Sequence, residues 1–132
     1  MCIRDRHDSV RSDVEIIALA WDILGKLGIK ELNLEINTLG DLNDRLNFQK
    51  SFLKWLEINK NSLDLDSQNR ITKNPLRILD SKDSEDIEVN KYAPNISDVL
   101  SEQSKKNFLE LKKILKDFNI LYEEDPFLVR GL

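Results

Sequence analysis

The chain has 132 residues, of which 40% are hydrophobic and 33% charged, ordinary proportions for a globular domain or a piece of one and unlike those of a disordered chain. Its formal charge of −4 at pH 7 argues against a free-standing nucleic-acid-binding module, because such modules carry a basic excess. The single cysteine, Cys2, and the single histidine, His7, exclude a disulfide framework and a zinc site built from these residue types. No apolar run is long enough to span a membrane and no secretion signal is present, so we expect a cytoplasmic protein without a membrane partner.

The first predicted element is a helix. Residues 1–10 show no periodicity, and we interpret them as a ragged leader whose first six residues are not native. Ser12 and Glu15 have the spacing of a capping box, which predicts a helix from Asp13 to about Leu27, ended by Gly28. Apolar residues occupy too many positions of this helix for one narrow stripe, so we expect it to be mostly buried.

A strand and a second helix follow. Leu32, Leu34 and Ile36 alternate with polar residues, which is the period of a strand with one apolar face. After a turn, the helical spacing predicts a helix from about Leu42 to Asn59. Its apolar side chains recur at helical spacing, which indicates a core or an interface rather than a platform for stacking nucleic-acid bases; they are Phe48, Phe52, Leu53, Trp55 and Leu56.

The middle of the chain is predicted to form several short elements. A brief helix is predicted near Leu65 to Thr72, followed by Pro75 and a short apolar anchor at residues 76–79. The acidic residues 83–90 are predicted to form a mobile loop. A long helix then reaches Phe118, with Ser97 and Ser101 as candidate caps, and Asn119 is expected to take the left-handed conformation after it.

The last six residues carry the clearest chemical signal. Phe127, Leu128 and Val129 read as a buried strand, which delivers Arg130 and then Gly131. The fixed donors of an arginine suit a phosphate or a carboxylate, and a following glycine lets a ligand come close. From these residues alone, an arginine paired with a protein carboxylate at a strand end is the favoured interpretation.

Other chemistries find little support. Residues 64–75 begin like a calcium-binding loop, but Asn69 stands where the loop needs glycine and Pro75 where it needs a bidentate glutamate. The four glycines stand apart, so no glycine-rich phosphate loop is present, and His7 is the only histidine that could activate a nucleophile. We therefore expect no protein-bound metal, and the chemistry rests on Arg130, with Glu35 a distant second.

Four segments together resemble histidyl-tRNA synthetase, in that family's order and spacing. They are residues 12–22 (SDVEIIALAWD), 34–40 (LEINTLG), 74–82 (NPLRILDSK) and 128–132 (LVRGL). The resemblance covers about residues 10–132. The third and fourth segments are its most specific signatures.

The resemblance implies an α+β fold, part of a class II aminoacyl-tRNA synthetase catalytic domain with an antiparallel sheet and flanking helices. Residues 11–40 match a helix and a strand of the catalytic core, and residues 101–132 match the helix and strand that return to it. Residues 41–100 match a mostly helical insertion domain, which in the family reaches toward the tRNA acceptor stem. The resemblance thus divides the chain into two core parts around an insertion.

The resemblance also implies an activity. The family joins histidine to ATP, with Mg²⁺, to give histidyl-adenylate, and then transfers the histidyl group to tRNA(His); the parent enzyme is a homodimer. Arg130 matches the arginine that lies against the α-phosphate and the histidine carboxylate, where it is catalytic and binds substrate, and Leu132 matches a position beside the histidine pocket. Because ATP-gripping motifs of the family are not found, no cofactor-binding residue is assigned, and we expect the isolated fragment to be inactive.

Two other functions stay open at this point. One is the non-catalytic paralogue that binds histidine as the regulatory subunit of ATP phosphoribosyltransferase; it usually reduces the insertion and departs from the arginine motif, which this chain keeps. The other is an acidic interaction module in which Arg130 forms a structural ion pair.

Overall fold

The computed structural model describes residues 10–129, and these form two compact units. The first combines the residues up to Glu35 with Glu102–Glu123, and the second combines Ile36–Ser101 with the residues from Glu124 onward. The leader proposed for residues 1–10 therefore lies almost wholly outside the described part, as do Arg130 and Leu132. Among the described residues, no helix is long and apolar enough to cross a membrane.

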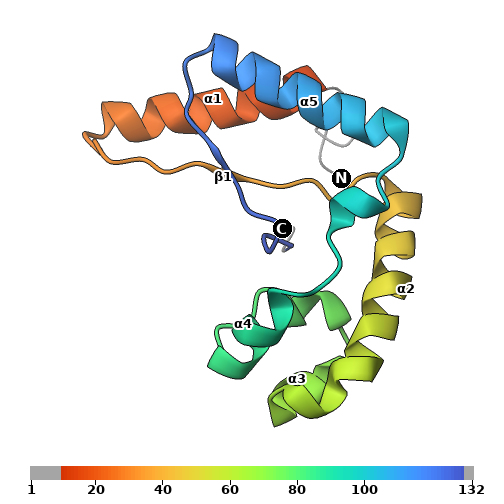
Figure 1. Ribbon diagram of the computed structural model, residues 1–132. Helices are drawn as coiled ribbons and strands as arrows, with labels where there is room; N and C mark the ends of the chain where they lie inside the picture. The colour runs from red at the N-terminus through yellow and green to blue at the C-terminus, as the bar shows by residue number, and fades with distance from the viewer. Residues whose placement is uncertain (1–9, 130–132) are drawn as a thin grey trace. The chain divides into compact units, whose positions relative to one another are not determined.

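The first unit is built on two helices that lie side by side, α1 (Val10–Lys26) and α5 (Glu102–Asp117) (Figure 1). Val14 of α1 and Leu115 of α5 are buried. The expectation that α1 is mostly buried is wrong within the described chain, since Leu19 and Ile23 of this helix are 60% and 47% exposed. One neighbouring helix covers only one stripe of a helix that is apolar over more than half of its circumference.

Both predicted helix ends are confirmed. Gly28 has φ +86°, and its N–H and that of Ile29 bond back to the carbonyls of Gly25 and Leu24 at 3.0 and 3.1 Å. Asn119 has φ +56° and ends α5 in the same way. The predicted start of α1 is wrong, because the helix begins at Val10 and Ser12 lies inside it.

The described strands are short and parallel. β1 (Glu35–Ile36) pairs with β2 (Glu123–Glu124) through bonds from the N–H of Glu123 to the carbonyl of Leu34, at 2.8 Å, and from Asp125 to Ile36, at 3.0 Å. The antiparallel sheet expected from the sequence is therefore not confirmed by this pair. The two strands are joined by a long crossover that contains helices, which is the connection that parallel pairing requires.

The terminal strand predicted from Phe127 is wrong in its described part. The N–H of Leu128 bonds to the carbonyl of Asp125 at 3.1 Å, and the Asp125 side chain accepts from the N–H of Phe127 at 2.9 Å. An aspartate followed by proline favours such a turn over an extended strand. The preceding residues 123–124 make the strand instead.

The second unit consists of short helices packed on α2 (Leu42–Asn59), whose bounds match the prediction. Along the chain follow η2 (Lys60–Ser62), α3 (Leu65–Arg70), η3 (Pro75–Ile78), α4 (Ser84–Asn90) and η4 (Ile96–Asp98). The aromatic side chains of α2 lie in the core, as predicted, with Phe48 stacked on Phe52 and Phe52 on Trp55 at ring distances of 5.8 Å. The core also takes residues from η3, including Leu76 and Ile78.

The mobile loop predicted at residues 83–90 is wrong, because this stretch forms α4. Asp83 caps the helix by accepting from the N–H of Glu85 at 2.9 Å. Asp86 is fully buried and accepts hydrogen bonds from the Ser67 hydroxyl and from the N–H of Asp64, the latter at 3.2 Å. The hydrogen bonds that the buried Asp86 side chain accepts anchor residues 83–90 in the second unit. The composition of this stretch alone resembles that of a solvated loop.

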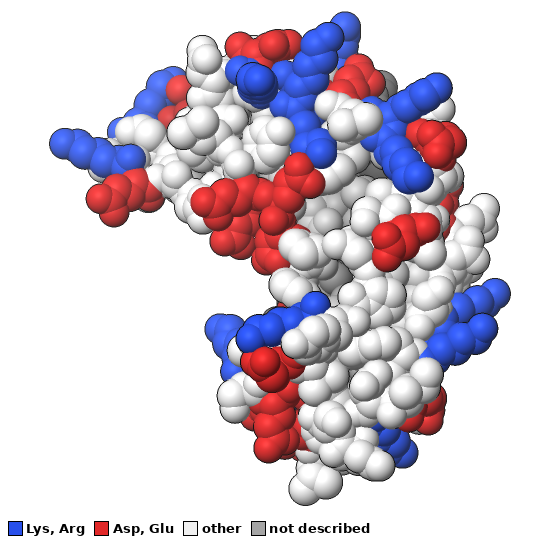
Figure 2. All heavy atoms as spheres, in the orientation of Figure 1, with Lys and Arg blue, Asp and Glu red and all other residues white. Residues whose placement is uncertain are grey.

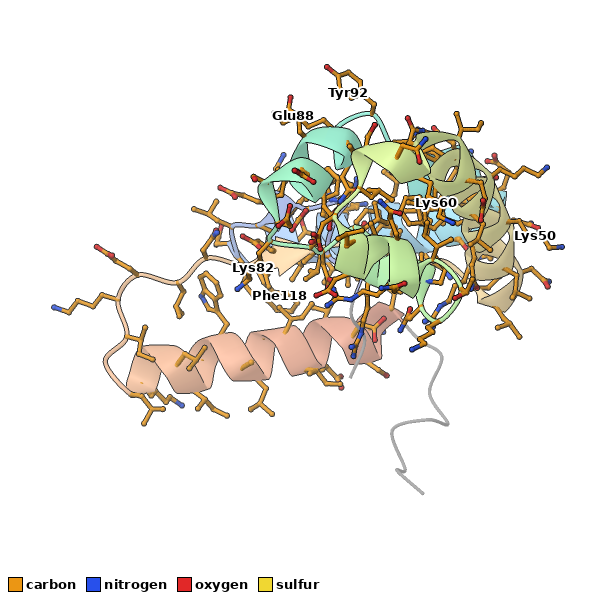
Figure 3. The ribbon with its side chains drawn as sticks, turned by 90° about the horizontal axis from the view of Figure 1, so that it is seen from below. Lys50, Lys60, Lys82, Glu88, Tyr92 and Phe118 are labelled. Atoms are coloured by element: carbon orange, nitrogen blue, oxygen red, sulfur yellow. The ribbon has the colours of Figure 1, made fainter. Side chains whose placement is uncertain are left out.

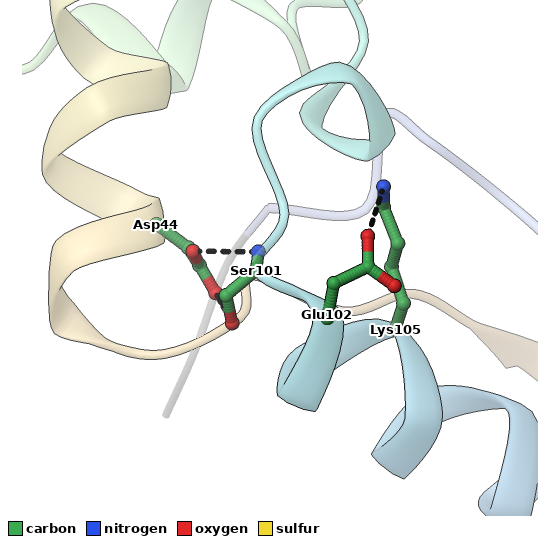
Figure 4. Close-up of polar contacts among 4 residues, drawn as sticks. All are labelled: Asp44, Ser101, Glu102 and Lys105. Atoms are coloured by element: carbon green, nitrogen blue, oxygen red, sulfur yellow. Dashed lines mark hydrogen bonds and ion pairs between the residues drawn. The ribbon is translucent and has the colours of Figure 1, made fainter.

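Asp44 joins the start of α2 to the residue that precedes α5 (Figure 4). Its carboxylate is 3% exposed and accepts from the Ser101 N–H at 2.9 Å, from the Ser101 hydroxyl at 3.3 Å and from the Asp41 N–H at 3.1 Å. Asp41 in turn accepts from the Asp44 N–H at 2.8 Å, which completes a capping box. We call these contacts the Asp44 latch; the Glu102–Lys105 pair in the same figure is exposed and contributes little.

We predict that Gly40→Ala destabilises the second unit. Gly40 has φ +65°, and a Cβ there would lie 2.6 Å from Asp44 Cβ and 2.8 Å from Leu100 Cδ2. Strain of this kind costs about 1–3 kcal/mol. The matched control is Gly25→Ala in α1, where nothing lies within 4 Å and a gain of up to about 1 kcal/mol is expected. Urea unfolding of both variants measures the difference, and equal effects of the two substitutions would contradict the latch.

Candidate functional site: the segment that leads to Arg130

The described part of the candidate site is the approach to Arg130, residues 125–129. The Asp125 turn described above fixes the direction in which the chain leaves β2. Val129, the residue before Arg130, is 6% exposed and belongs to the core of the second unit. Packing therefore holds the described chain in place up to the residue before Arg130.

A single side chain fastens this approach to the first strand. The Asn37 Nδ2 donates to the carbonyls of Leu128, at 3.1 Å, and Pro126, at 3.4 Å. These two bonds tie the residue after β1 to the residues on either side of Phe127. The sequence could not identify this role, since Asn37 is only one polar position in an alternating strand and its partners lie 89 and 91 residues further on.

The two most specific sequence segments meet in one core. Leu76, Ile78 and Leu79 of residues 74–82 share a buried cluster with Val129 of residues 128–132. The segment 74–82 therefore packs against the end of the approach to Arg130. Glu35, the second candidate, lies in β1, and its side chain is exposed. It accepts a long hydrogen bond of 3.5 Å from the Nδ2 of Asn33.

A cavity of about 560 Å³ lies beside this approach, within the second unit. Its walls come from residues 79–82, from α4 and from residues 125–129. We call it the motif pocket. Across residues 10–129, no cluster of three or more His, Cys, Asp or Glu side chains is arranged to hold a metal ion.

The charges of the second unit are mixed. Figure 2 shows basic and acidic side chains interspersed over the visible face, and Lys50 projects outward from α2 in Figure 3. Lys91 bonds to Glu88 at 2.6 Å, and this hydrogen bond, together with the attraction between the two charges, raises the pKa of Lys91 above its ordinary value. Lys91 is therefore cationic at neutral pH.

Comparison with known proteins relates the chain to one family. No family model matches it. It is 72% identical over 126 residues to the histidine–tRNA ligase of Prochlorococcus marinus strain MIT 9301, and 50% identical over 122 residues to that of Rippkaea orientalis. These alignments cover 96% and 92% of this chain but 30% and 28% of the relatives, so the chain spans less than a third of their length.

A solved structure agrees with these relatives. The apo histidyl-tRNA synthetase of S. aureus superposes with a TM-score of 0.69 and 32% identity, over 96% of this chain and 29% of that one. The resemblance inferred from the four sequence segments is thereby confirmed.

We predict that Asn37→Ala loosens the approach to Arg130. Removing the donor breaks two hydrogen bonds in exposed surroundings, where water replaces the donor, so the expected net loss is about 0.5–1.5 kcal/mol. Hydrogen exchange at the Leu128 amide should accelerate by about tenfold as the turn opens more often. The control is Asn33→Ala, which removes only the exposed 3.5 Å contact with Glu35. Unchanged exchange in Asn37→Ala would show that Val129 alone holds the segment.

Proposed function

We propose that this chain, which matches histidyl-tRNA synthetases in sequence and in structure, is part of a histidine–tRNA ligase. The enzyme would activate histidine with ATP to histidyl-adenylate, with release of pyrophosphate, and would transfer the histidyl group to tRNA(His), with release of AMP. The observation that carries the proposal is the 72% identity over 126 residues to a histidine–tRNA ligase. The relatives named above are ligases, so the histidine-binding regulatory paralogue is not favoured.

Arg130 is the proposed catalytic residue. Its guanidinium would contact the α-phosphate of ATP and the histidine carboxylate, and it would stabilise the negative charge that builds up as the carboxylate attacks phosphorus. Two features of the approach support this role: Val129, the residue before Arg130, is buried, and Asn37 fastens the turn at residues 126–128. A guanidinium that starts from a fixed backbone loses less freedom when it binds an anion. Leu132 is proposed to line the histidine pocket.

The remaining parts of the proposal concern the parent enzyme. Residues 11–40 and 101–132 would belong to a class II catalytic domain with an antiparallel sheet, and residues 41–100 would form its helical insertion. The Asp44 latch supports this division, because it ties residue 44 to residue 101 and so brings the two ends of the insertion together. Mg²⁺ would arrive with ATP as a substrate complex, and the enzyme would act as a cytoplasmic homodimer.

The test is histidine-dependent exchange of pyrophosphate into ATP by the full-length gene product. We predict that Arg130→Ala lowers the exchange rate by about 10²–10³-fold, the usual effect of losing one donor to a transition-state anion. Its thermal unfolding should change little, because Arg130 serves a ligand rather than the core.

Arg45→Ala is the matched control, since Arg45 is an exposed arginine of α2. Its exchange rate should stay close to that of the unchanged enzyme. Loss of stability in Arg130→Ala in proportion to its loss of activity would contradict the catalytic role. Absence of histidine-dependent exchange in the folded full-length protein would contradict the proposed function itself.

A further inference from the structure

The motif pocket has the size and the wall of a small-molecule site. Its volume of about 560 Å³ falls within the range usual for ligand pockets, roughly 300–1,000 Å³. Three large apolar side chains of the wall stay partly open to solvent, with exposures of 46% for Ile87, 38% for Phe127 and 39% for Leu128. Leu79 and Val129 complete the apolar part of the wall. Covering these surfaces would favour binding of an apolar body.

The wall carries two lysines and two aspartates, and one of the lysines, Lys82, is available to an anion. Asp125 already accepts from the N–H of Phe127 at 2.9 Å, and Asp80 also interacts within the chain. Of the two lysines, Lys91 is held only by an exposed pair with Glu88, and such pairs are weak. Lys82 makes no ion pair among residues 10–129, and in Figure 3 it lies apart from Glu88. Lys82 is therefore the cation of the wall that is available to a ligand, while the two carboxylates are held by their own contacts and keep their charge.

Asn90 adds a polar feature to the same wall. It is 3% exposed, and its Nδ2 donates to the carbonyl of Ile78 at 2.6 Å. Its Oδ1 is buried and has no hydrogen-bond partner among the described residues. Because this oxygen is inaccessible to solvent, Asn90 shapes the wall through its bond to Ile78 and is not itself a contact for a bound molecule.

We propose that the motif pocket binds a small anionic molecule with an aromatic body. The rings would pack on Ile87 and Phe127, and the anionic group would meet Lys82. Leu128 and Val129 directly precede Arg130, so a bound molecule would also contact the segment that leads to this arginine. That last consequence rests on the proposed function, whereas the binding itself does not.

The experiment uses 8-anilinonaphthalene-1-sulfonate as the probe, because it combines two aromatic groups with one negative charge. The probe is titrated into the folded full-length protein without histidine, ATP or tRNA, and its fluorescence is followed to saturation. We expect one saturable site, and Lys82→Glu and Ile87→Glu should each raise the Kd by at least about tenfold, the equivalent of about 1.4 kcal/mol. Circular dichroism and thermal unfolding establish that both variants are folded.

The control is Leu121→Glu, which alters a residue of the first unit that is 83% exposed and lines a different cavity. It should leave the Kd unchanged. A Kd that is unchanged in both pocket variants would overturn the proposal. So would binding to the 132-residue chain but not to the full-length protein, because the remaining chain would then cover the pocket. Either failure leaves pyrophosphate exchange unaffected, so it is distinguishable from failure of the proposed function.

Discussion

The second unit depends on one buried carboxylate. Asp44 must lose its water to pack at the start of α2, and it is compensated by donors from Asp41 and Ser101, which lie 3 residues before it and 57 residues after it. The contact leaves no room for a side chain at Gly40. The bond with Asp41 caps α2, and the bonds with Ser101 join the two ends of residues 44–101, an excursion of the chain. One side chain therefore acts both at the start of α2 and where the excursion returns. All the helices between residues 42 and 98 lie within that excursion.

In the approach to Arg130, too, one polar side chain joins segments that lie far apart in the chain, but here the group is a neutral amide rather than a carboxylate. A neutral amide, Asn37, spans two carbonyls of the turn, and a buried Val129 ends the described segment in the core that residues 76–79 also enter. This fixed approach is the structural feature that supports the proposed role of Arg130. This is how the two most specific sequence segments, which lie far apart in the chain, can serve one site. The motif pocket lies against the same contact, so binding there and chemistry at Arg130 would share residues 128 and 129.

The sequence predicted what local signals control. The bounds of α2, the left-handed residues Gly28 and Asn119 and the aromatic core all follow from periodicity and from backbone preference. It failed where distant contacts override composition: α4 forms because Asp86 is buried on donors from α3 and the residue before it, and the role of Asn37 depends on carbonyls about 90 residues away. The exposed face of α1 was read as buried because periodicity reports an apolar face but not what covers it. The roles of Arg130 and Leu132 come from the family resemblance and stay predictions.

The most direct test of the account is an exchange of segments. The stretch of the Prochlorococcus marinus strain MIT 9301 enzyme that matches this chain would be replaced by the matching residues of this chain, and formation of histidyl-tRNA by the chimera would be measured. If the chain is a working part of a histidine–tRNA ligase, the charging rate should stay within about tenfold of the recipient enzyme, a change of about 1.4 kcal/mol in activation free energy. A folded chimera that binds ATP and histidine but forms no histidyl-tRNA would contradict it.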